Sequence, residues 1–168
     1  MLFSPACARA LLDIVSSRKT TSLQLAIGAD HGGFELKGKL KGFLEAAGYE
    51  VQDLGPFSLD AADDYPDFAK KLTNTLRADA QGMGIAICRS AQGMGMAVNR
   101  VKGVRGAIAW NEEEAKKSRE HNDANVLCLS ADHIDDATNE AIVKTWLETP
   151  FSGDECHVRR IKKSDQLS

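Results

Sequence analysis

The segment CRSAQGMG, residues 88–95, has residue types that could bind an anion and move a proton. It follows a short apolar stretch and leads into a predicted helix. A loop of small residues in that position presents backbone N–H groups to a phosphate, a carboxylate or an enediolate. Cys88 stands at the mouth of the loop beside Arg89, where the helix dipole and the cation both favour the thiolate. Most buried free cysteines are simply small apolar residues, so this segment alone leaves both explanations of Cys88 open.

Two other segments place polar side chains next to the ends of predicted elements. The sequence DHGG, residues 30–33, follows the first apolar stretch, and its two glycines let the backbone approach a ligand closely. A polar pair such as Asp30 and His31 at that position favours a binding role. His121 ends a predicted helix, and the Asn and Asp residues after it turn the chain. Taken alone, His121 is better explained as a histidine that stabilises the helix C-terminus through the dipole.

The glycines do not follow the patterns of nucleotide-binding loops. Gly82 and Gly84 precede their strand instead of following it, and the spacing Gly93-x-Gly95-x-x-Val98 lacks the third glycine of the dinucleotide fingerprint. The Walker spacing of P-loop enzymes is also absent from the sequence. We therefore expect neither NAD binding nor nucleoside triphosphate hydrolysis.

Composition narrows the class of protein further. Hydrophobic residues make up 43% of the chain and charged residues 27%, as in an ordinary globular protein, and no apolar run approaches the roughly 20 residues of a membrane span. Lys and Arg number 21 against 24 acids, which argues against a nucleic-acid binder held by bulk positive charge. The four cysteines form no C-x-x-C pair and no zinc-type spacing. We therefore expect no disulfide framework, no structural metal, and a reducing, cytoplasmic location.

The elements that position these segments can be predicted from the hydrophobic pattern. Short apolar stretches predict five strands, at residues 23–28, 49–55, 82–88, 106–110 and 125–130. Helical patterns lie at residues 34–48, 65–80, 94–99, 112–121 and 134–148. This alternation predicts one α/β domain over residues 23–168, a three-layer sandwich with a five-stranded parallel sheet covered by helices on both faces. Residues 1–22 form an N-terminal extension to which we assign no role.

The predicted topology selects the same segments as the chemistry does. In open parallel sheets, ligands bind at the carboxyl ends of the strands. The segments that follow the predicted strands are residues 30–31, the loop after Asp53, residues 88–95, Asn111 and residues 130–133. They contain most of the unusual chemistry in the chain.

Five segments in a fixed order resemble one enzyme family. They are AIGADHGGFELK, DDYPDFA, the Cys88 loop with AVNRVKGVRGAI, SREHNDANVL and TPFSGDECHVRRI. In order and spacing they resemble the RpiB/LacAB sugar-phosphate isomerase family, and most of all its ribose-5-phosphate isomerase B type. The resemblance runs from about Leu23 to Lys163, nearly the whole chain apart from the extension.

The resemblance implies a Rossmann-like fold and an aldose–ketose isomerase of pentose phosphate metabolism. The default reaction converts ribose 5-phosphate to ribulose 5-phosphate through an enediolate, with no metal or organic cofactor. The family's proton-transfer base falls on Cys88, and its ring-opening histidine falls on His121. The family also implies a homodimer or a dimer of dimers, with an active site shared between subunits.

Further residues are expected to bind the substrate, either because they match the family's site or because they lie in the Cys88 loop. They are Asp30, His31, Tyr65, Arg89, Ser90, Gly93, Gly95, Asn122, His157 and Arg160. The N–H groups of residues 90–95 are expected to hold the enediolate oxygen.

The sequence departs from the family where the phosphate is expected. Asp132 stands where relatives carry an arginine after the fifth strand, and Cys156 replaces the first arginine of an R-H-x-x-R motif. A carboxylate within about 4 Å of a phosphate dianion would cost several kcal/mol. Either Asp132 points away or the substrate is held differently. Arg89 and Ala91 stand where glycines are usual, and Arg89 is either a replacement cation or a solvated loop residue.

Two other functions stay open at this point. The altered anion end is compatible with an isomerase of another sugar phosphate, such as allose or galactose 6-phosphate or a tetrose phosphate. A non-catalytic paralogue that binds a sugar phosphate is the second alternative, and the presence of both Cys88 and His121 argues against it.

Overall fold

The computed structural model describes residues 25–78 and 82–167, and the predicted N-terminal extension lies outside the described residues. In this part of the chain, five strands form one parallel sheet. They are β1 (Leu25–Ala29), β2 (Val51–Asp53), β3 (Met83–Cys88), β4 (Gly106–Ile108) and β5 (Val126–Ser130), in the spatial order β2-β1-β3-β5-β4. The predicted five-stranded parallel sheet is confirmed, although β2 and β4 are shorter than the apolar pattern suggested.

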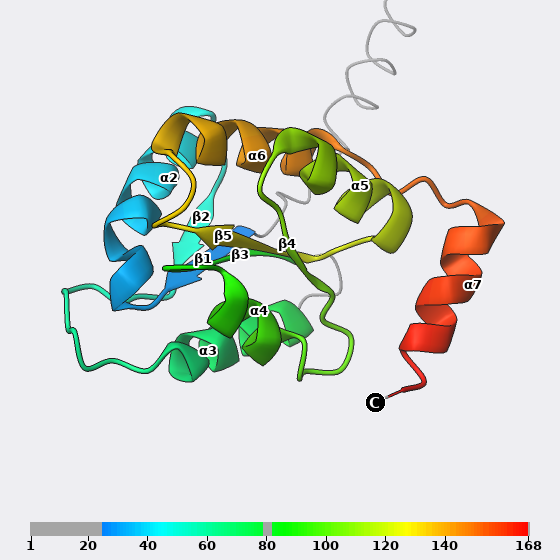
Figure 1. The fold of residues 1–168 in the computed structure, drawn as a ribbon, viewed down its shortest axis with the longest axis horizontal. Coiled ribbons are helices and arrows are strands. Elements are labelled where there is room, and N and C mark those ends of the chain that lie inside the picture. Colours follow the sequence, from blue (N-terminus) through cyan, green and yellow to red (C-terminus); the bar gives the residue numbers. More distant parts are fainter. Residues whose placement is uncertain (1–24, 79–81, 168) are drawn as a thin grey trace, which may run out of the picture.

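Helices cover both faces of this sheet (Figure 1). The helical elements of the described residues are the 3-10 turn η1 (His31–Gly33), α2 (Phe34–Ala46), α3 (Tyr65–Ala78), α4 (Gln92–Val98), α5 (Glu112–Asn122), α6 (Asp136–Glu148) and α7 (Glu155–Ser164). Helices α2, α5 and α6 pack on one face, and α3 and α4 pack on the other. The chain therefore has the predicted three-layer α/β architecture.

The central strands read as continuous apolar runs because they are buried on both faces. Every residue of β1, β3 and β5 is buried. Along β3, Ile85 and Ile87 belong to the core under α2 and α6, whereas Ala86 and Cys88 belong to the core under α3 and α4. This alternation, the normal one for a strand, directs the Cys88 side chain toward the α3 and α4 layer.

Capping side chains fix several helix ends. Asn111 Oδ1 accepts a hydrogen bond from the Glu114 N–H at 2.9 Å and so caps α5. Asp135 caps α6 in the same way, through the Thr138 N–H at 2.9 Å. Gly48 follows α2 with φ of 90°, a conformation that glycine adopts without strain.

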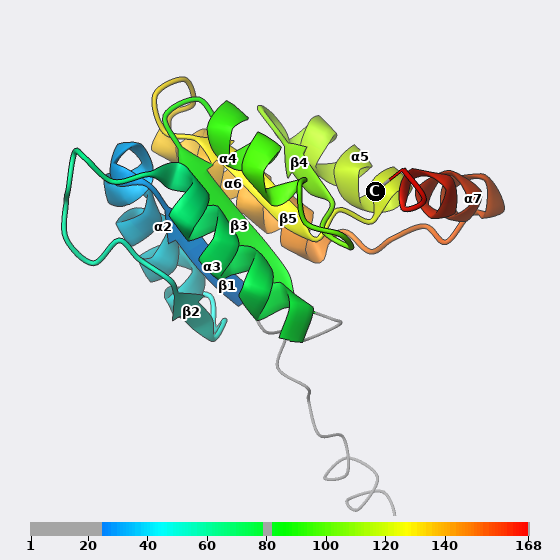
Figure 2. The same cartoon turned by 90° about the horizontal axis from the view of Figure 1, so that it is seen from below.

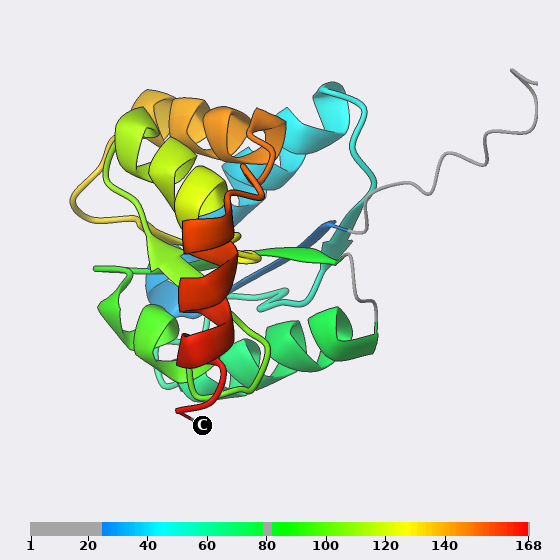
Figure 3. The ribbon, with the colours of Figure 1, turned by 90° about the vertical axis from the view of Figure 1, so that its right-hand side faces the viewer.

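Helix α7 lies beyond the elements predicted from the sequence. It stands at one side of the sandwich, where it contacts α5 (Figures 2 and 3). None of its residues is buried, and its few apolar side chains include the half-buried Val158 and Ile161. Pro150 marks the end of the preceding helical pattern, and α7 lacks the wide apolar stripe by which a helix that packs on its own domain is recognised.

Candidate active site

Cys88 ends β3 and is followed by the turn that opens α4. Its side chain is buried, and its thiol is free. Ala91 adopts a left-handed conformation with φ of 64° immediately before α4. A left-handed conformation costs a non-glycine residue roughly 1–2 kcal/mol. The turn therefore has a backbone shape for which glycine is the natural residue, and this chain adopts it with alanine.

The start of α4 supplies N–H groups next to Cys88, but Gly95 is not among them. The first N–H groups of a helix have no acceptor within the helix. The Gly95 N–H donates to the Ala91 carbonyl at 2.9 Å, and a Cβ at Gly95 would lie 3.2 Å from the Ile108 side chain. Gly95 therefore serves packing against β4, so the expectation that its N–H holds the enediolate is wrong. Gly93 is placed differently, because a Cβ there would lie 3.2 Å from the Tyr65 ring.

The DHGG segment packs directly against the Cys88 loop. A Cβ at Gly32 would collide with the Arg89 side chain, and a Cβ at Gly33 would lie 2.8 Å from the Ile87 carbonyl oxygen. Asp30 is buried, and its Oδ1 accepts from the Gly33 N–H at 3.1 Å. Both glycines are thus required for the close approach of the two segments, which places Asp30 and His31 beside Cys88.

A carboxylate from the loop before α3 holds the His31 ring. Asp63 Oδ1 lies 2.7 Å from His31 Nδ1 and accepts from the His31 backbone N–H at 3.0 Å. Asp63 was not among the residues selected from the sequence, because nothing local in the DDYPDFA segment shows that it reaches His31. Tyr65 lies two residues later, at the start of α3.

The expected anion end contains paired charges. Arg89 Nη1 and Asp132 Oδ2 lie 3.4 Å apart, and both side chains are largely exposed. The Arg89 carbonyl accepts from the Ser130 hydroxyl at 2.6 Å and from the Asp132 N–H at 3.0 Å. Lys39 Nζ lies 2.6 Å from Asp136 Oδ2. The four charged side chains and His31 share the lining of one hollow of about 380 Å³, so Asp132 does not point away from the anion end.

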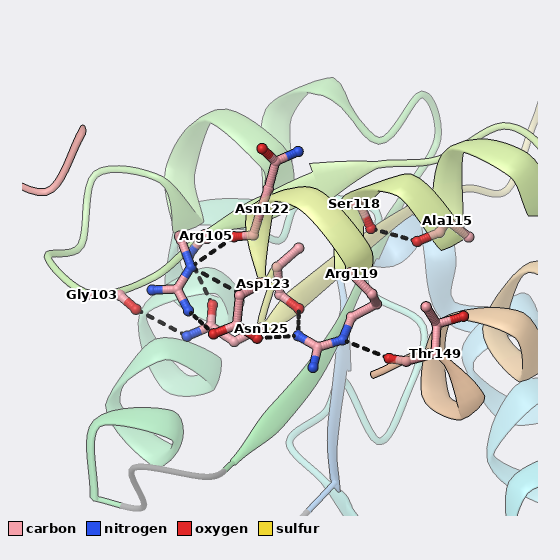
Figure 4. Close-up of polar contacts among 10 residues, drawn as sticks. Gly103, Arg105, Ala115, Ser118, Arg119, Asn122, Asp123, Asn125 and Thr149 are labelled. Atoms are coloured by element: carbon pink, nitrogen blue, oxygen red, sulfur yellow. Dashed lines mark hydrogen bonds and ion pairs between the residues drawn. The ribbon is translucent and has the colours of Figure 1, made fainter. Parts of the chain in front are cut away.

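A second group of predicted residues lies around the turn after α5 (Figure 4). Asp123 ends the helix in a left-handed conformation with φ of 46°. Its Oδ1 accepts from Arg119 Nη1 at 2.9 Å and its Oδ2 from Arg105 Nη2 at 2.8 Å. Arg105 Nε also donates to the Asn122 carbonyl at 3.1 Å, while the Asn122 side chain points away from Arg105. The two arginines fix the turn and leave the exposed side chains of His121 and Asn122 available.

Helix α7 brings two more predicted residues to this turn. The rings of His121 and His157 stack, with centroids 4.4 Å apart and planes 9° apart. Asn122 and Arg160 line the same hollow of about 690 Å³, between α7 and the segment that leads into β4. His121, Asn122, His157 and Arg160 therefore form one cluster, as expected for residues that contact one ligand.

The two clusters lie at opposite ends of the sheet. In the β3–β5 register, Cys88 pairs with Ser130 and Gly84 pairs with Val126, and the Gly84 N–H donates to the Asn125 carbonyl. His121 lies before Asn125, so at least about 13 Å of strand separates its end of the sheet from Cys88. The loop before α3 and helix α7 accordingly lie on opposite sides of the molecule in Figures 1 and 2. One chain does not bring the two clusters around one sugar phosphate.

A second thiol lies near Cys88 but cannot take its place. Cys128 in β5 is fully buried, and the burial, together with the neighbouring Cys88, raises the pKa of the Cys128 thiol to about 12. Cys128 therefore stays protonated at neutral pH. Cys88 is the thiol that the fold places at the carboxyl end of the sheet.

Residues 25–78 and 82–167 contain neither a candidate metal site nor a candidate membrane-spanning helix. These ranges contain no group of three or more His, Cys, Asp or Glu side chains placed to hold a metal ion. They also contain no helix with the length and apolar character needed to cross a lipid bilayer.

Known proteins share this architecture over most of the chain. The chain is 39% identical over 139 residues to ribose-5-phosphate isomerase B of Mycolicibacterium paratuberculosis, which covers 83% of this chain and 87% of the relative. A crystal structure of ribose 5-phosphate isomerase from Thermotoga maritima matches with a TM-score of 0.82 and 40% identity, over 86% of this chain and 98% of that one. A crystal structure of ribose-5-phosphate isomerase B from Mycoplasma genitalium with bound ribulose-5-phosphate matches with a TM-score of 0.84 and 39% identity, over 87% and 96%.

The family model of ribose/galactose isomerases matches residues 25–164, which include both clusters described above. The extent of this match and the identity to the relatives confirm the resemblance drawn from the motifs. The chain belongs to the ribose/galactose isomerase family.

Proposed function

We propose that this protein is an aldose–ketose isomerase that interconverts ribose 5-phosphate and ribulose 5-phosphate. The observation that carries the proposal is the position of Cys88, a free thiol at the carboxyl end of β3, with Gly32 of the DHGG segment and Tyr65 packed against its loop. The names of the relatives support the reaction, and the Mycoplasma genitalium structure supports a pentulose phosphate as ligand.

We assign the carbon proton transfer to Cys88. Its thiolate removes the proton from C2 of the open-chain aldose, and the C1 carbonyl electrons move to O1 to give an enediolate. The thiol then delivers the proton to C1, while the proton of O2 passes to O1 and the carbonyl forms at C2. The N–H groups at the start of α4 are placed beside the thiol, where each good donor to an oxyanion contributes a few kcal/mol to the transition state.

We assign ring opening to His121, assisted by Asn122. A pentose phosphate is mostly a closed ring in water, so its O1 hydroxyl must lose a proton and its ring oxygen must gain one. An imidazole can do both in turn. The turn fixed by Arg105 and Arg119 holds His121 and Asn122 on the surface rather than in the core.

The active site requires a second copy of the chain. Because Cys88 and His121 lie at opposite ends of the sheet, each site combines the Cys88 cluster of one subunit with the His121 cluster of another. Charge supports this arrangement, since Arg89 and Lys39 at the Cys88 end already face Asp132 and Asp136. Helix α7 supplies four cations that form no ion pair within residues 25–78 and 82–167, and they are Arg159, Arg160, Lys162 and Lys163. We therefore infer a homodimer or a dimer of dimers.

The residues at the expected phosphate end of the site favour one alternative, in which the same isomerisation acts on another sugar phosphate. Asp132 and Cys156 stand where the family pattern has arginines, so a substrate of another length is the second candidate. Turnover measured with purified protein on pentose, hexose and tetrose phosphates tests both. Fastest turnover of ribose 5-phosphate supports the proposal, fastest turnover of another sugar supports the alternative, and no turnover of any would identify a binding paralogue.

We also propose that the enzyme works in the cytoplasm. Cys88, Cys128 and Cys156 are all free thiols, as is usual in a reducing compartment. Its substrate class, charged sugar phosphates, is consistent with the same location.

A further inference from the structure

The carboxylate of Asp63 makes two contacts with one residue, His31, which lies 32 positions earlier in the chain. Its Oδ1 accepts from the His31 backbone N–H at 3.0 Å and lies 2.7 Å from Nδ1 of the ring. Both side chains are mostly buried, with 26% of His31 and 11% of Asp63 exposed. A contact this short between shielded groups fixes the ring more firmly than an exposed ion pair could.

The geometry determines which ring nitrogen carries the proton. An ionised carboxylate can only accept hydrogen bonds, so Nδ1 must be the protonated nitrogen of a neutral His31. Nε2 is then the unprotonated nitrogen, and it has an acceptor lone pair. Since Asp63 occupies Nδ1, Nε2 is also the only ring nitrogen left for a ligand.

The free nitrogen belongs to a residue that faces the Cys88 end of the sheet. His31 lines the hollow of about 380 Å³ that Arg89 and Asp132 also line. The Gly32 backbone packs against Arg89 so closely that a Cβ would collide with it, which ties the His31 backbone to the Cys88 loop. His31 and Cys88 therefore lie at the same carboxyl edge of the sheet, and a sugar phosphate that enters this hollow passes next to His31.

We propose that Asp63 is a positioning residue, which holds His31 as the Nδ1–H tautomer so that Nε2 accepts a hydrogen bond from a hydroxyl of the bound sugar. This inference rests on the proposed substrate site and adds a specificity contact to it. A sugar hydroxyl carries the proton that such an acceptor needs, whereas an ionised phosphate oxygen does not.

A buried atom of the same carboxylate supports a role beyond folding. Asp63 Oδ2 is shielded from solvent and has no hydrogen-bond partner in the described part of the chain. Leaving a buried acceptor unpaired costs about 1–3 kcal/mol. The Asp63 carboxylate bears this cost while its other oxygen holds a ring that faces the site. Such an arrangement is expected where the ring binds a ligand.

The first test is the tautomer of His31, read from the ¹⁵N chemical shifts of its imidazole at neutral pH. His31→Gln identifies the signals by their loss. We expect a proton on Nδ1 alone in the wild type, and a shift toward the Nε2–H form in Asp63→Ala. Protonation of both nitrogens in the wild type, or an unchanged tautomer in Asp63→Ala, would overturn the inference, and neither reading depends on turnover.

The second test is kinetic, and a substitution of the neighbouring residue provides a matched control. Asp64→Ala removes the same charge one residue away, on an exposed side chain that makes no contact with His31. We expect Asp63→Ala to raise KM for ribose 5-phosphate about tenfold with kcat nearly unchanged, in the lower range of losses when the partner of a ligating histidine is removed. Asp63→Asn keeps an oxygen acceptor and should stay within about threefold of wild type.

The outcomes separate this inference from the proposed reaction. Equal KM values for Asp63→Ala and Asp64→Ala would show that Asp63 serves the fold alone. If Asp63→Ala does not fold, the wild-type tautomer and the Asp63→Asn kinetics decide the question. A wild-type protein without turnover on any sugar phosphate would contradict the proposed function, whereas the tautomer would still report on the Asp63–His31 pair.

Discussion

His121 and His157 stack with their ring centroids 4.4 Å apart, and this contact joins α5 to α7. The two helices otherwise touch little, because no residue of α7 is buried. The stack therefore has two separable properties: it orients α7, and it places two imidazoles at one point on the surface. Substitutions can distinguish them.

We expect His157→Phe to keep the orientation of α7 and to weaken the binding of the sugar phosphate. A phenyl ring can stack on His121 but offers no hydrogen-bond donor to a phosphate. KM for the sugar phosphate should rise about tenfold, with kcat less affected, and His157→Ala should raise KM further because the stack is lost as well. Steady-state kinetics of the two variants provides the test, and equal KM values would show that orientation contributes nothing.

Cys88→Ala should fold normally and lose nearly all turnover, while substrate binding changes only a few-fold. Cys128→Ala is the matched control, because the pKa of its thiol, raised to about 12, already excludes it from proton transfer. Iodoacetamide labelling, with the modified peptides mapped by mass spectrometry, should modify Cys88 before Cys128 and should slow at Cys88 when substrate is present. Substantial turnover by Cys88→Ala would contradict the assignment of the base.

The sequence was most informative where structure is local. The strands are buried on both faces and so appear as apolar runs, and Asn111 caps α5 through a residue only three positions away. The segments around Cys88 and His31 were also found, because strand ends in a parallel sheet meet at one edge. Their glycines reflect a close approach between segments, which the structure locates at Arg89 and Ile87.

What the sequence did not reveal depends on contacts between distant segments. Asp63 reaches His31 over 32 positions, and Asp123 reaches Arg105 over 18 positions. No periodicity encodes such pairs. The sequence does not predict helix α7 for a related reason. The helix buries no residue against its own chain, so its few apolar residues do not form the stripe of a helix that packs on the domain.

His121→Ala should harm turnover of ring-forming substrates far more than turnover of a sugar that cannot close a furanose. Erythrose 4-phosphate is such a sugar, since the hydroxyl that would close the ring carries the phosphate. We expect a large fall in kcat for ribose 5-phosphate and a small one for the tetrose phosphate, measured with the same enzyme preparation. Equal losses on both would move His121 to a general binding role.

Mixed oligomers test whether the two clusters meet across subunits. Neither Cys88→Ala nor His121→Ala should turn over ribose 5-phosphate well alone. In a randomly reassorted equimolar mixture, half of the dimers are mixed and each mixed dimer has one intact site, so activity should return to roughly a quarter of wild type. The oligomeric state is checked by sedimentation. A fully active monomer, or a mixture that regains nothing, would refute the shared site.

The anion end offers a test of coupling between two cations. Arg89 pairs with Asp132 at 3.4 Å, but both side chains are largely exposed, so the pair is weak enough for Arg89 to turn toward a phosphate. Cys156 replaces an arginine of the family pattern on α7, the helix that a second subunit would bring to this hollow. A guanidinium can contact a phosphate through two parallel hydrogen bonds, which a thiol cannot.

We therefore expect Cys156→Arg to lower KM for ribose 5-phosphate and Arg89→Ala to raise it, with the larger rise in the native Cys156 background. Two cations that serve one dianion are coupled, so the four KM values of this cycle should be non-additive when measured at fixed ionic strength. Lys41→Ala, which breaks an ion pair with Glu45 within α2, is the control and should be additive with Cys156→Arg. Strict additivity of Arg89→Ala with Cys156→Arg, or weaker phosphate binding by Cys156→Arg, would show that Arg89 does not compensate for the missing arginine. The hollow lined by Arg89 and Asp132 would then be shaped for a ligand whose charge is recognised without that arginine.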